Sequence, residues 1–228
     1  MTIKFKFFVL PIFMLVSLQI FAQHNMGFKL NFGASSRKTS FTFPAGFTVN
    51  YTTASKLAPS FSLGGFYEFN FGKNSALSAE LLYTELNGTE DFNRQLFDKD
   101  RNVTGFENST ITTRVSFIAL PISYTYQIRN FRILLGFQTS IDVASSGEMK
   151  ITRVENGIQT DMTINSETVA QDKGDFGVRL GFCYDLSKKV ALEINFYEGM
   201  NDMADSESTK IKYRQMVFGL RYRFFQKN

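Results

Sequence analysis

Charged side chains recur at alternate positions in several short segments of this chain, next to small or apolar residues. Acidic and basic groups placed in this way could act as a general acid and base, line an ion path, or neutralise one another in a buried network. The set contains five cations and six acids: Lys29, Glu68, Glu80, Arg132, Asp142, Asp175, Arg179, Asp185, Glu193, Arg221 and Arg223. Because the charges nearly balance, we predict a structural network, and keep the ion path and a catalytic carboxylate pair as alternatives.

Other residues that commonly carry chemistry are sparse. The single histidine is His24, ahead of the first predicted strand, and the single cysteine is Cys183, which allows no intrachain disulfide and no zinc site of the cysteine type. Residues Asp98–Asn102 resemble the start of a calcium loop, but Val103 and Ser109 stand where Gly and Glu are needed. We therefore predict no catalytic residue, no metal and no cofactor, and a non-enzymatic protein.

The elements that position the charges are strands in which apolar and polar side chains alternate. Since successive side chains of a strand point to opposite faces, each such strand has one apolar and one polar face. In the first strand Phe28 and Leu30 share the apolar face, and Lys29 lies on the other. Eight segments follow this pattern, near residues 26–33, 60–71, 77–84, 118–127, 131–143, 175–185, 190–197 and 216–224. The pattern fails at Phe66 and Leu82, which fall on the polar side, and near Ser116, where a change of phase indicates a bulge.

The connections between these segments alternate in length. Short turns are predicted near 72–75, 128–131 and 186–189. The other connections are long or moderate, at 37–58, 88–110, 146–172 and 203–208. Short turns at one end and long loops at the other are typical of outer-membrane barrels, and eight strands leave an interior just wide enough for side chains. The sequence predicts an all-β fold, an eight-stranded antiparallel up-and-down transmembrane β-barrel with lipid outside and a side-chain-filled polar lumen.

The connection at 146–172 has a pattern of its own. Two alternating runs, 149–154 and 158–164, flank Asn156–Gly157, a strong local signal for a hairpin turn. We predict a ribbon that protrudes beyond the membrane and has an exposed edge able to bind a partner strand. A merely stiff loop is the alternative. The loops 88–110 and 146–172 are where we expect a protein partner.

The N-terminus indicates export. Lys4 and Lys6 precede an apolar run at residues 7–21, which is followed by Ala22, and this is the pattern of a secretory signal peptide at 1–22 ahead of a barrel domain at 23–228. An uncleaved membrane helix is the alternative, but the run is shorter than the roughly 20 residues that span a bilayer. The formal charge of +4 falls to +2 when the two lysines leave, so nothing favours nucleic-acid binding.

A soluble lipocalin-like carrier is the rival barrel, and its faces would be reversed, with charges outside and apolar side chains lining a cavity. Glycines such as Gly136 and Gly181 share the charged face, as crowding inside a narrow barrel would require. The opposite face carries almost no charge in mid-strand. Both observations favour the membrane protein.

Three phrases resemble a known family. Residues 79–83 (AELLY), residues 117–124 (FIALPISY) and a last strand that ends in Phe look like the PorT-like outer membrane β-barrel family of Bacteroidota. The architecture is similar to that of small barrels of the OmpA and OmpX type. The resemblance implies an outer-membrane location in a Gram-negative bacterium and insertion by the barrel-assembly machinery. We also predict a monomer in contact with outer-membrane lipid or lipopolysaccharide. We predict a structural or surface-interaction role. The alternatives are a narrow, porin-like channel and a component linked to protein secretion.

Overall fold

The computed structural model describes residues 23–41, 51–98, 102–168, 174–202 and 209–226. The predicted signal peptide at 1–22 and the connection at 203–208 lie outside them. Ten strands make up the described chain: β1 (Gln23–Phe41), β2 (Tyr51–Lys56), β3 (Ala58–Asn70), β4 (Ser75–Phe97), β5 (Val103–Ile128), β6 (Phe131–Glu155), β7 (Ile158–Thr168), β8 (Gly174–Asp185), β9 (Val190–Gly199) and β10 (Thr209–Gln226). No helix among the described residues is long and apolar enough to cross a membrane.

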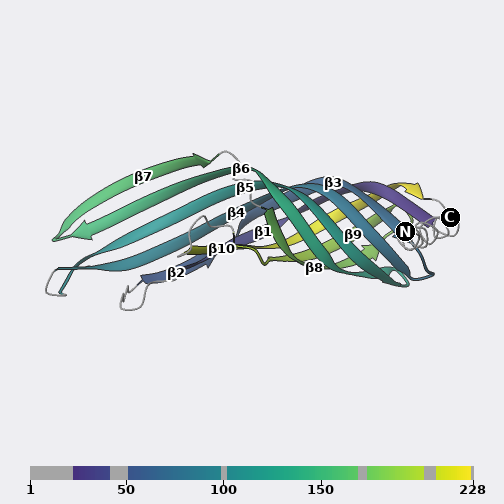
Figure 1. The fold of residues 1–228 in the computed structure, drawn as a ribbon, viewed down its shortest axis with the longest axis horizontal. Helices are drawn as coiled ribbons and strands as arrows, with labels where there is room; N and C mark the ends of the chain where they lie inside the picture. The colour runs from purple at the N-terminus through teal and green to yellow at the C-terminus, as the bar shows by residue number, and fades with distance from the viewer. Residues whose placement is uncertain (1–22, 42–50, 99–101, 169–173, 203–208, 227–228) are drawn as a thin grey trace, which may run out of the picture.

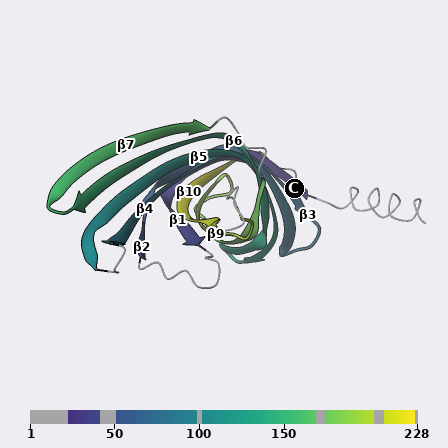
Figure 2. The same ribbon diagram turned by 60° about the vertical axis from the view of Figure 1, so that its left-hand side comes forward.

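Eight of the strands close into a ring. Each pairs antiparallel with its neighbours in the order β4-β3-β1-β10-β9-β8-β6-β5, and β5 pairs with β4 to complete the circle. Figure 2 shows this ring nearly end-on. The short turns lie together at one end, where the described ends of β1 and β10 also pair, Asn25 opposite Gln226. The predicted all-β, eight-stranded up-and-down barrel is confirmed.

The two faces of the wall have opposite character, as predicted. Phe28 and Phe32 are 63% and 59% exposed on the outside, whereas Lys29 between them is 3% exposed. The lipocalin-like alternative, with the charges outside, is therefore wrong. Phe66 and Leu82, the two apolar residues on the polar side, are buried inside the barrel.

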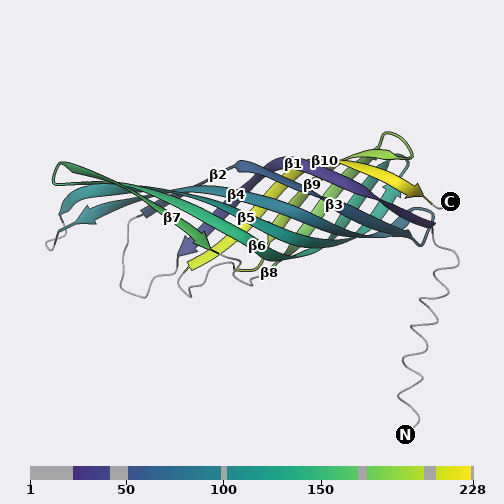
Figure 3. The ribbon, with the colours of Figure 1, turned by 90° about the horizontal axis from the view of Figure 1, so that it is seen from above.

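Several strands extend well beyond the ends predicted for them, on the side of the long connections. Strands β4, β5 and β6 contain 23, 26 and 25 residues and run far past the ring into a protruding sheet (Figures 1 and 3). The regions 37–58, 88–110 and 146–172, predicted as long loops, are thus strand over most of their described length. Their threonine-rich segments, such as 110–113, have the β-branched side chains that strands favour but lack an apolar outer face.

Two strands outside the ring border the protruding sheet. Strand β2 pairs with β4 on one side, from Tyr51 opposite Arg94 to Lys56 opposite Thr89. Strand β7 pairs with β6 on the other side. The predicted hairpin at Asn156–Gly157 is confirmed, with φ angles of 51° and 78° that suit a tight two-residue turn.

The bulge predicted near Ser116 is also present, but the additional residue belongs to the neighbouring strand. Ser116 lies opposite Ala144 and Phe117 opposite Asp142, so Val143 of β6 has no residue across from it. Side chains of β6 point in alternate directions, and the extra residue reverses which of them face inward. Asp142 faces the barrel interior below the bulge, and Met149 continues the same face above it.

Candidate functional site

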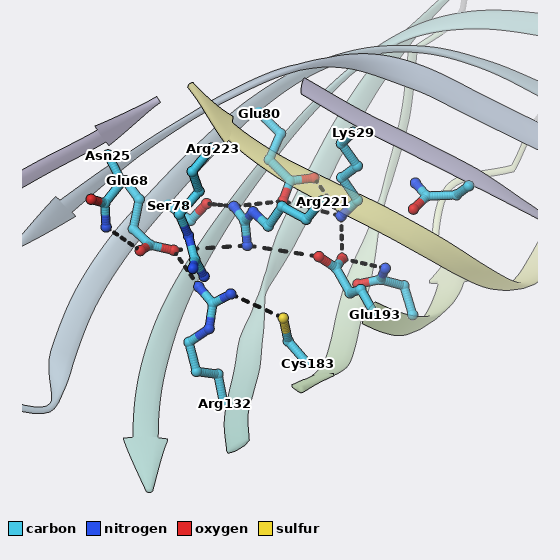
Figure 4. Close-up of polar contacts among 12 residues, drawn as sticks. Asn25, Lys29, Glu68, Ser78, Glu80, Arg132, Cys183, Glu193, Arg221 and Arg223 are labelled. Carbon is cyan, nitrogen blue, oxygen red and sulfur yellow. Dashed lines mark hydrogen bonds and ion pairs between the residues drawn. The ribbon is translucent and has the colours of Figure 1, made fainter. Parts of the chain in front are cut away.

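The centre of the lumen is a cluster of three cations and two acids contributed by five strands, β1, β4, β8, β9 and β10. Figure 4 labels Lys29, Glu80, Glu193 and Arg221 of this cluster. Lys29 Nζ lies 3.1 Å from Glu80 and forms a shorter contact with Glu193. Arg179 contacts the same two carboxylates at 2.7 and 3.2 Å. Arg221 lies 3.5 Å from Glu80 and 3.7 Å from Glu193. Each carboxylate therefore faces several cations, which offsets the desolvation of all five groups.

A second group of charges lies nearer the turn end of the barrel. Arg132 bridges Glu68 at 2.9 Å and Asp185 at 2.8 Å, and Arg223 contacts Asp185 at 2.7 Å. Arg221 lies 3.8 Å from Glu68 and so connects the two groups. A polar cavity of about 360 Å³ opens from this network at the turn end. Nine of the eleven predicted charges thus form one connected network.

Arg221 is the most enclosed member of the network. It is fully buried, donates a hydrogen bond to Ser78 Oγ at 2.8 Å, and its guanidinium carbon lies 3.8 Å from the centroid of the Phe66 ring. A cation over an aromatic face is attracted by the ring quadrupole. This contact explains why Phe66 occupies an inward position that the alternation assigned to a polar residue.

The structure places Asp142 and Asp175 outside the network. Asp175 accepts a hydrogen bond of 2.6 Å from the Tyr197 hydroxyl and has no ion pair among the described residues. Asp142 lies opposite Phe117 of a buried apolar cluster and lines a separate cleft toward the protruding sheet. The sequence showed that both residues lie on the inner face. Their depth along the barrel could not be read from it, because depth depends on the register and stagger between strands.

Neutral residues of the network were missed. Asn25 donates to Glu68 at 2.9 Å, Asn195 accepts from Arg179 at 2.9 Å, and Cys183 Sγ accepts from Arg132 at 3.0 Å. Cys183 and Asn195 lie at inward positions of predicted strands, and Asn25 lies one residue before the first predicted strand, in phase with its inward positions; this is the only signal that could have selected them. Their partners could not be read from the sequence, because the strands that supply them are far apart in the chain.

A buried apolar cluster lies beside the network, toward the protruding sheet. Leu86, Val115, Phe117 and Tyr213 form it, with the rings of Phe117 and Tyr213 edge to face at 6.5 Å. Polar residues lie at the same depth: Arg37 is opposite Tyr213 in the register and 3.4 Å from Glu90, and Asp142 is opposite Phe117. The apolar cluster therefore covers the part of the inner wall that β4, β5 and β10 make.

The single histidine and the stretch that resembles a calcium loop lie apart from the charge network. His24 contacts Tyr67 and Phe69 at the turn end of the barrel. Asp98 accepts hydrogen bonds from Asn102, and the rest of that stretch, 99–101, lies outside the described residues. In the part of the chain that the structure describes, no three His, Cys, Asp or Glu side chains come together in a group that could hold a metal ion.

The protruding sheet carries ion pairs of a more exposed kind. Lys56 of β2 contacts Asp91 of β4 at 2.5 Å, and Arg94 contacts Glu107 at 2.9 Å. Hydrogen bonds from Lys56 and from Thr110 hold the pKa of Asp91 below its usual range. Pairs of this exposure contribute little to stability individually, so they orient neighbouring strands more than they hold them together.

Comparison with known proteins agrees with this architecture. The sequence profile described as the outer membrane protein beta-barrel domain matches residues 21–205, and the chain belongs to that family. The protein is therefore an outer-membrane β-barrel of a Gram-negative bacterium, as predicted. None of the curated proteins matches the sequence significantly.

Several solved outer-membrane proteins have similar structures at low identity. Ail, the attachment invasion locus protein of Yersinia pestis, is 11% identical over 89% of this chain and 99% of its own, with a TM-score of 0.36. OprG of Pseudomonas aeruginosa is 12% identical over 89% and 95%, with a TM-score of 0.37. Neisserial surface protein A is 11% identical over 87% and 97%, with a TM-score of 0.34.

Proposed function

We propose that this protein is a closed, non-enzymatic outer-membrane barrel that displays its protruding sheet as a docking platform for an extended segment of another protein. The observation that carries the proposal is the open edge of β7. The barrel would anchor the sheet, and the sheet would do the binding.

The free edge of β7 is long. Eleven register pairs join β7 to β6, from Ile158 opposite Glu155 to Thr168 opposite Ser145, and no strand pairs with its other side among the described residues. An edge of this kind presents unpaired backbone N–H and C=O groups to a partner strand. The sequence of β7, IQTDMTINSET, has no Pro and no Lys, residues that commonly block such pairing.

One face of the sheet next to this edge is apolar. Ile111, Met149 and Ile164 form a row across β5, β6 and β7, and Ile151 lies beside Met162 in a second row. Met162 and Ile164 are 54% and 46% exposed. When a peptide adds a strand to a sheet edge, backbone hydrogen bonds give affinity and side-chain contacts on such a face give specificity.

The filled lumen supports a binding role over a transport role. Arg221, Glu80 and Glu193 occupy the barrel axis region with almost no exposed side-chain surface. Phe117 and its buried apolar neighbours add further side chains to the lumen toward the protruding sheet. The narrow channel stays the second candidate, and the polar cavity at the turn end is the feature that favours it.

The family match is to the broad barrel domain, so a PorT-like link to protein secretion stays a prediction, to be tested by crosslinking to periplasmic partners. We also propose that the protein is a monomer that contacts lipopolysaccharide and is inserted by the barrel-assembly machinery. Its exposed apolar belt, which includes Phe28 and Phe137, supports the membrane contact.

A trimmed hairpin tests the docking proposal. Lys150 and Thr163 lie opposite one another, so replacing residues 151–162 by Asn-Gly shortens β6 and β7 without changing their register. The probe is a fluorescein-labelled peptide with the sequence of residues 158–165 of β7, because the edge of β5 that trimming exposes pairs in the fold with residues of β6 and not with β7. Fluorescence anisotropy with the refolded protein in lipid nanodiscs should show saturable binding to the natural chain and none to the trimmed chain.

A scrambled peptide controls for non-specific adsorption, and the heat-shifted mobility of the folded barrel on a gel controls for folding. Equal binding of the peptide to both chains, or no binding to either, would contradict the edge of β7 as the docking site.

A further inference from the structure

A cleft adjoins the apolar cluster, where β1 and β10 approach the inner face of the protruding sheet, and Val115 and Tyr213 belong to both. Its volume is about 330 Å³. Apolar side chains from four strands line it: Ile111, Val115, Met149, Ile164 and Ile211. Seven polar side chains complete the lining, and the most buried of them are Arg37, Asp142 and Tyr213. An apolar cleft with a few convergent polar groups is the usual form of a small-molecule site.

Asp142 is the unusual member of this lining. Asp142 is only 6% exposed, and its Oδ1 atom has no hydrogen-bond partner among the described residues. Buried polar atoms are nearly always hydrogen-bonded, since leaving one unpaired costs free energy. The bulge at Val143 is what sets Asp142 at the base of the cleft, directly before the point where the inward residues of β6 change phase.

The one buried cation of the cleft is already engaged. Arg37 Nε lies 3.4 Å from Glu90 Oε2, and Glu90 also accepts a hydrogen bond of 2.7 Å from the backbone N–H of Thr39. The charges of Arg37 and Glu90 cancel, so the carboxylate of Asp142 is the uncompensated charge at the base of the cleft. Glu148, which also lines the cleft, contacts Lys150 at 3.1 Å.

We propose that this cleft binds a small molecule that has an ammonium group and an apolar body. The ammonium donates a hydrogen bond to Asp142 Oδ1 and neutralises its charge, and the apolar body packs against Ile111, Met149 and Ile211. A charge-assisted hydrogen bond in a cleft with apolar walls is stronger than the same contact in water. The cleft shares Ile111, Met149 and Ile164 with the apolar face of the docking proposal, but its anchor, Asp142, lies outside that row, so the dependence of binding on the ligand's charge is tested apart from peptide docking.

Tryptamine is a suitable probe, since it combines an ammonium with an apolar ring system. The chain contains no Trp, so indole fluorescence reports on the probe alone. The full-length mature protein is refolded into lipid nanodiscs, and the anisotropy of tryptamine is followed as protein is added, with empty nanodiscs to correct for partition into lipid. Indole-3-propionate, which carries a carboxylate in place of the ammonium, is the matched ligand of opposite charge.

Two variants and a control separate the anchor from the cavity. Asp142→Asn keeps the shape of the side chain and removes its charge. Gly147→Leu fills the cleft, since a Cβ at Gly147 would meet its nearest atoms at 3.8 Å and fit without moving the backbone. Asp161→Asn is the control, because Asp161 lies on β7 outside the cleft lining and contacts Thr152 and Gln159.

We expect saturable tryptamine binding that weakens by about tenfold or more in Asp142→Asn, as for the loss of a hydrogen bond to a charged group. Gly147→Leu should abolish binding and Asp161→Asn should leave it unchanged. Indole-3-propionate should bind at least about tenfold more weakly than tryptamine. The proposal would be overturned if tryptamine bound to Gly147→Leu as tightly as to the natural protein. It would also be overturned if indole-3-propionate bound as tightly as tryptamine. Each chain is first shown to be folded by its heat-shifted mobility, and Gly147→Leu decides the matter if Asp142→Asn does not fold.

Discussion

Substituting Glu80 by Gln should destabilise the barrel more than any change at an exposed ion pair. Glu80 contacts Lys29 at 3.1 Å, Arg179 at 2.7 Å and Arg221 at 3.5 Å, and the Glu80 side chain is 1% exposed. Glutamine has nearly the same shape but no charge, so three buried cations would be left with Glu193 as their nearest acid. Removing one partner of a buried ion pair typically costs about 3–5 kcal/mol, and we expect a loss in this range from the free energy of unfolding.

The assay is urea unfolding of the protein in phospholipid vesicles. The folded fraction is read from the heat-shifted gel band and from circular dichroism, since the chain has no Trp for fluorescence. Glu198→Gln is the matched control: Glu198 lies 2.6 Å from Arg214, but their side chains are 49% and 56% exposed. An exposed pair of this kind contributes about 1 kcal/mol or less.

A second change tests the electrostatic origin of the loss. Adding Lys29→Met to Glu80→Gln removes one of the cations that lost its partner, so the double variant should be more stable than the sum of the single effects predicts. A Glu80→Gln barrel within about 1 kcal/mol of the natural protein, the range of an exposed pair, would refute the network as a stabilising element.

Three further predictions concern the lumen, the wall and the sheet. The natural protein should give no single-channel steps in planar bilayers. Arg179→Ala, which removes a buried cation of the network, should give measurable conductance. Large conductance of the natural protein would contradict a closed lumen. Gly136→Val should prevent folding, because a Cβ there would lie 2.0 Å from a backbone oxygen of β5. Gly147→Val should fold, since a Cβ at Gly147 would have its nearest atom at 3.8 Å. The heat-shifted mobility on a gel distinguishes the two outcomes. The hydrogen bond from Lys56 lowers the pKa of Asp91 in the folded protein. The contact therefore stabilises the β2–β4 pairing fully above the pKa of Asp91 in the unfolded chain, about 3.9. This stabilisation is lost as the pH falls through the lower pKa of Asp91 in the folded protein. Proteolysis of β2 by pepsin should therefore increase in acid relative to the barrel strands, and Asp91→Asn should show the faster cleavage without the pH dependence.

The sequence was most informative where lipid imposes a simple rule. Side chains alternate with a period of two, and those that meet hydrocarbon must be apolar, so the outward set that includes Phe28 and Phe137 was legible residue by residue. The same rule assigned Lys29, Glu80 and Arg221 to the interior, where all three are buried. The turn at Asn156–Gly157 was legible because few residues other than Asn and Gly adopt positive φ easily.

Beyond the membrane this rule no longer applies, and apart from the hairpin at Asn156–Gly157 the strands there were not predicted. No hydrocarbon contacts these parts of β4 and β5, so their outer faces need not be apolar, and the polar, threonine-rich segments resembled loops although they form strands. Strand β2 was missed for the same reason.

The composition and alternation of this chain by themselves determined that it forms a barrel, which side chains face lipid, and that the interior is charged. Only the tertiary structure decided which charges meet. Lys29 and Glu193 are 164 residues apart in the chain, and their contact depends on the ring closing between β1 and β10 with one particular register. It also decided that Asp142 stands apart from the network, because its place beside the bulge at Val143, opposite Phe117, sets it at a different depth from the other charges. Alternation fixes the direction of a side chain, whereas its depth and its partners are set by the stagger of strands that are distant in sequence.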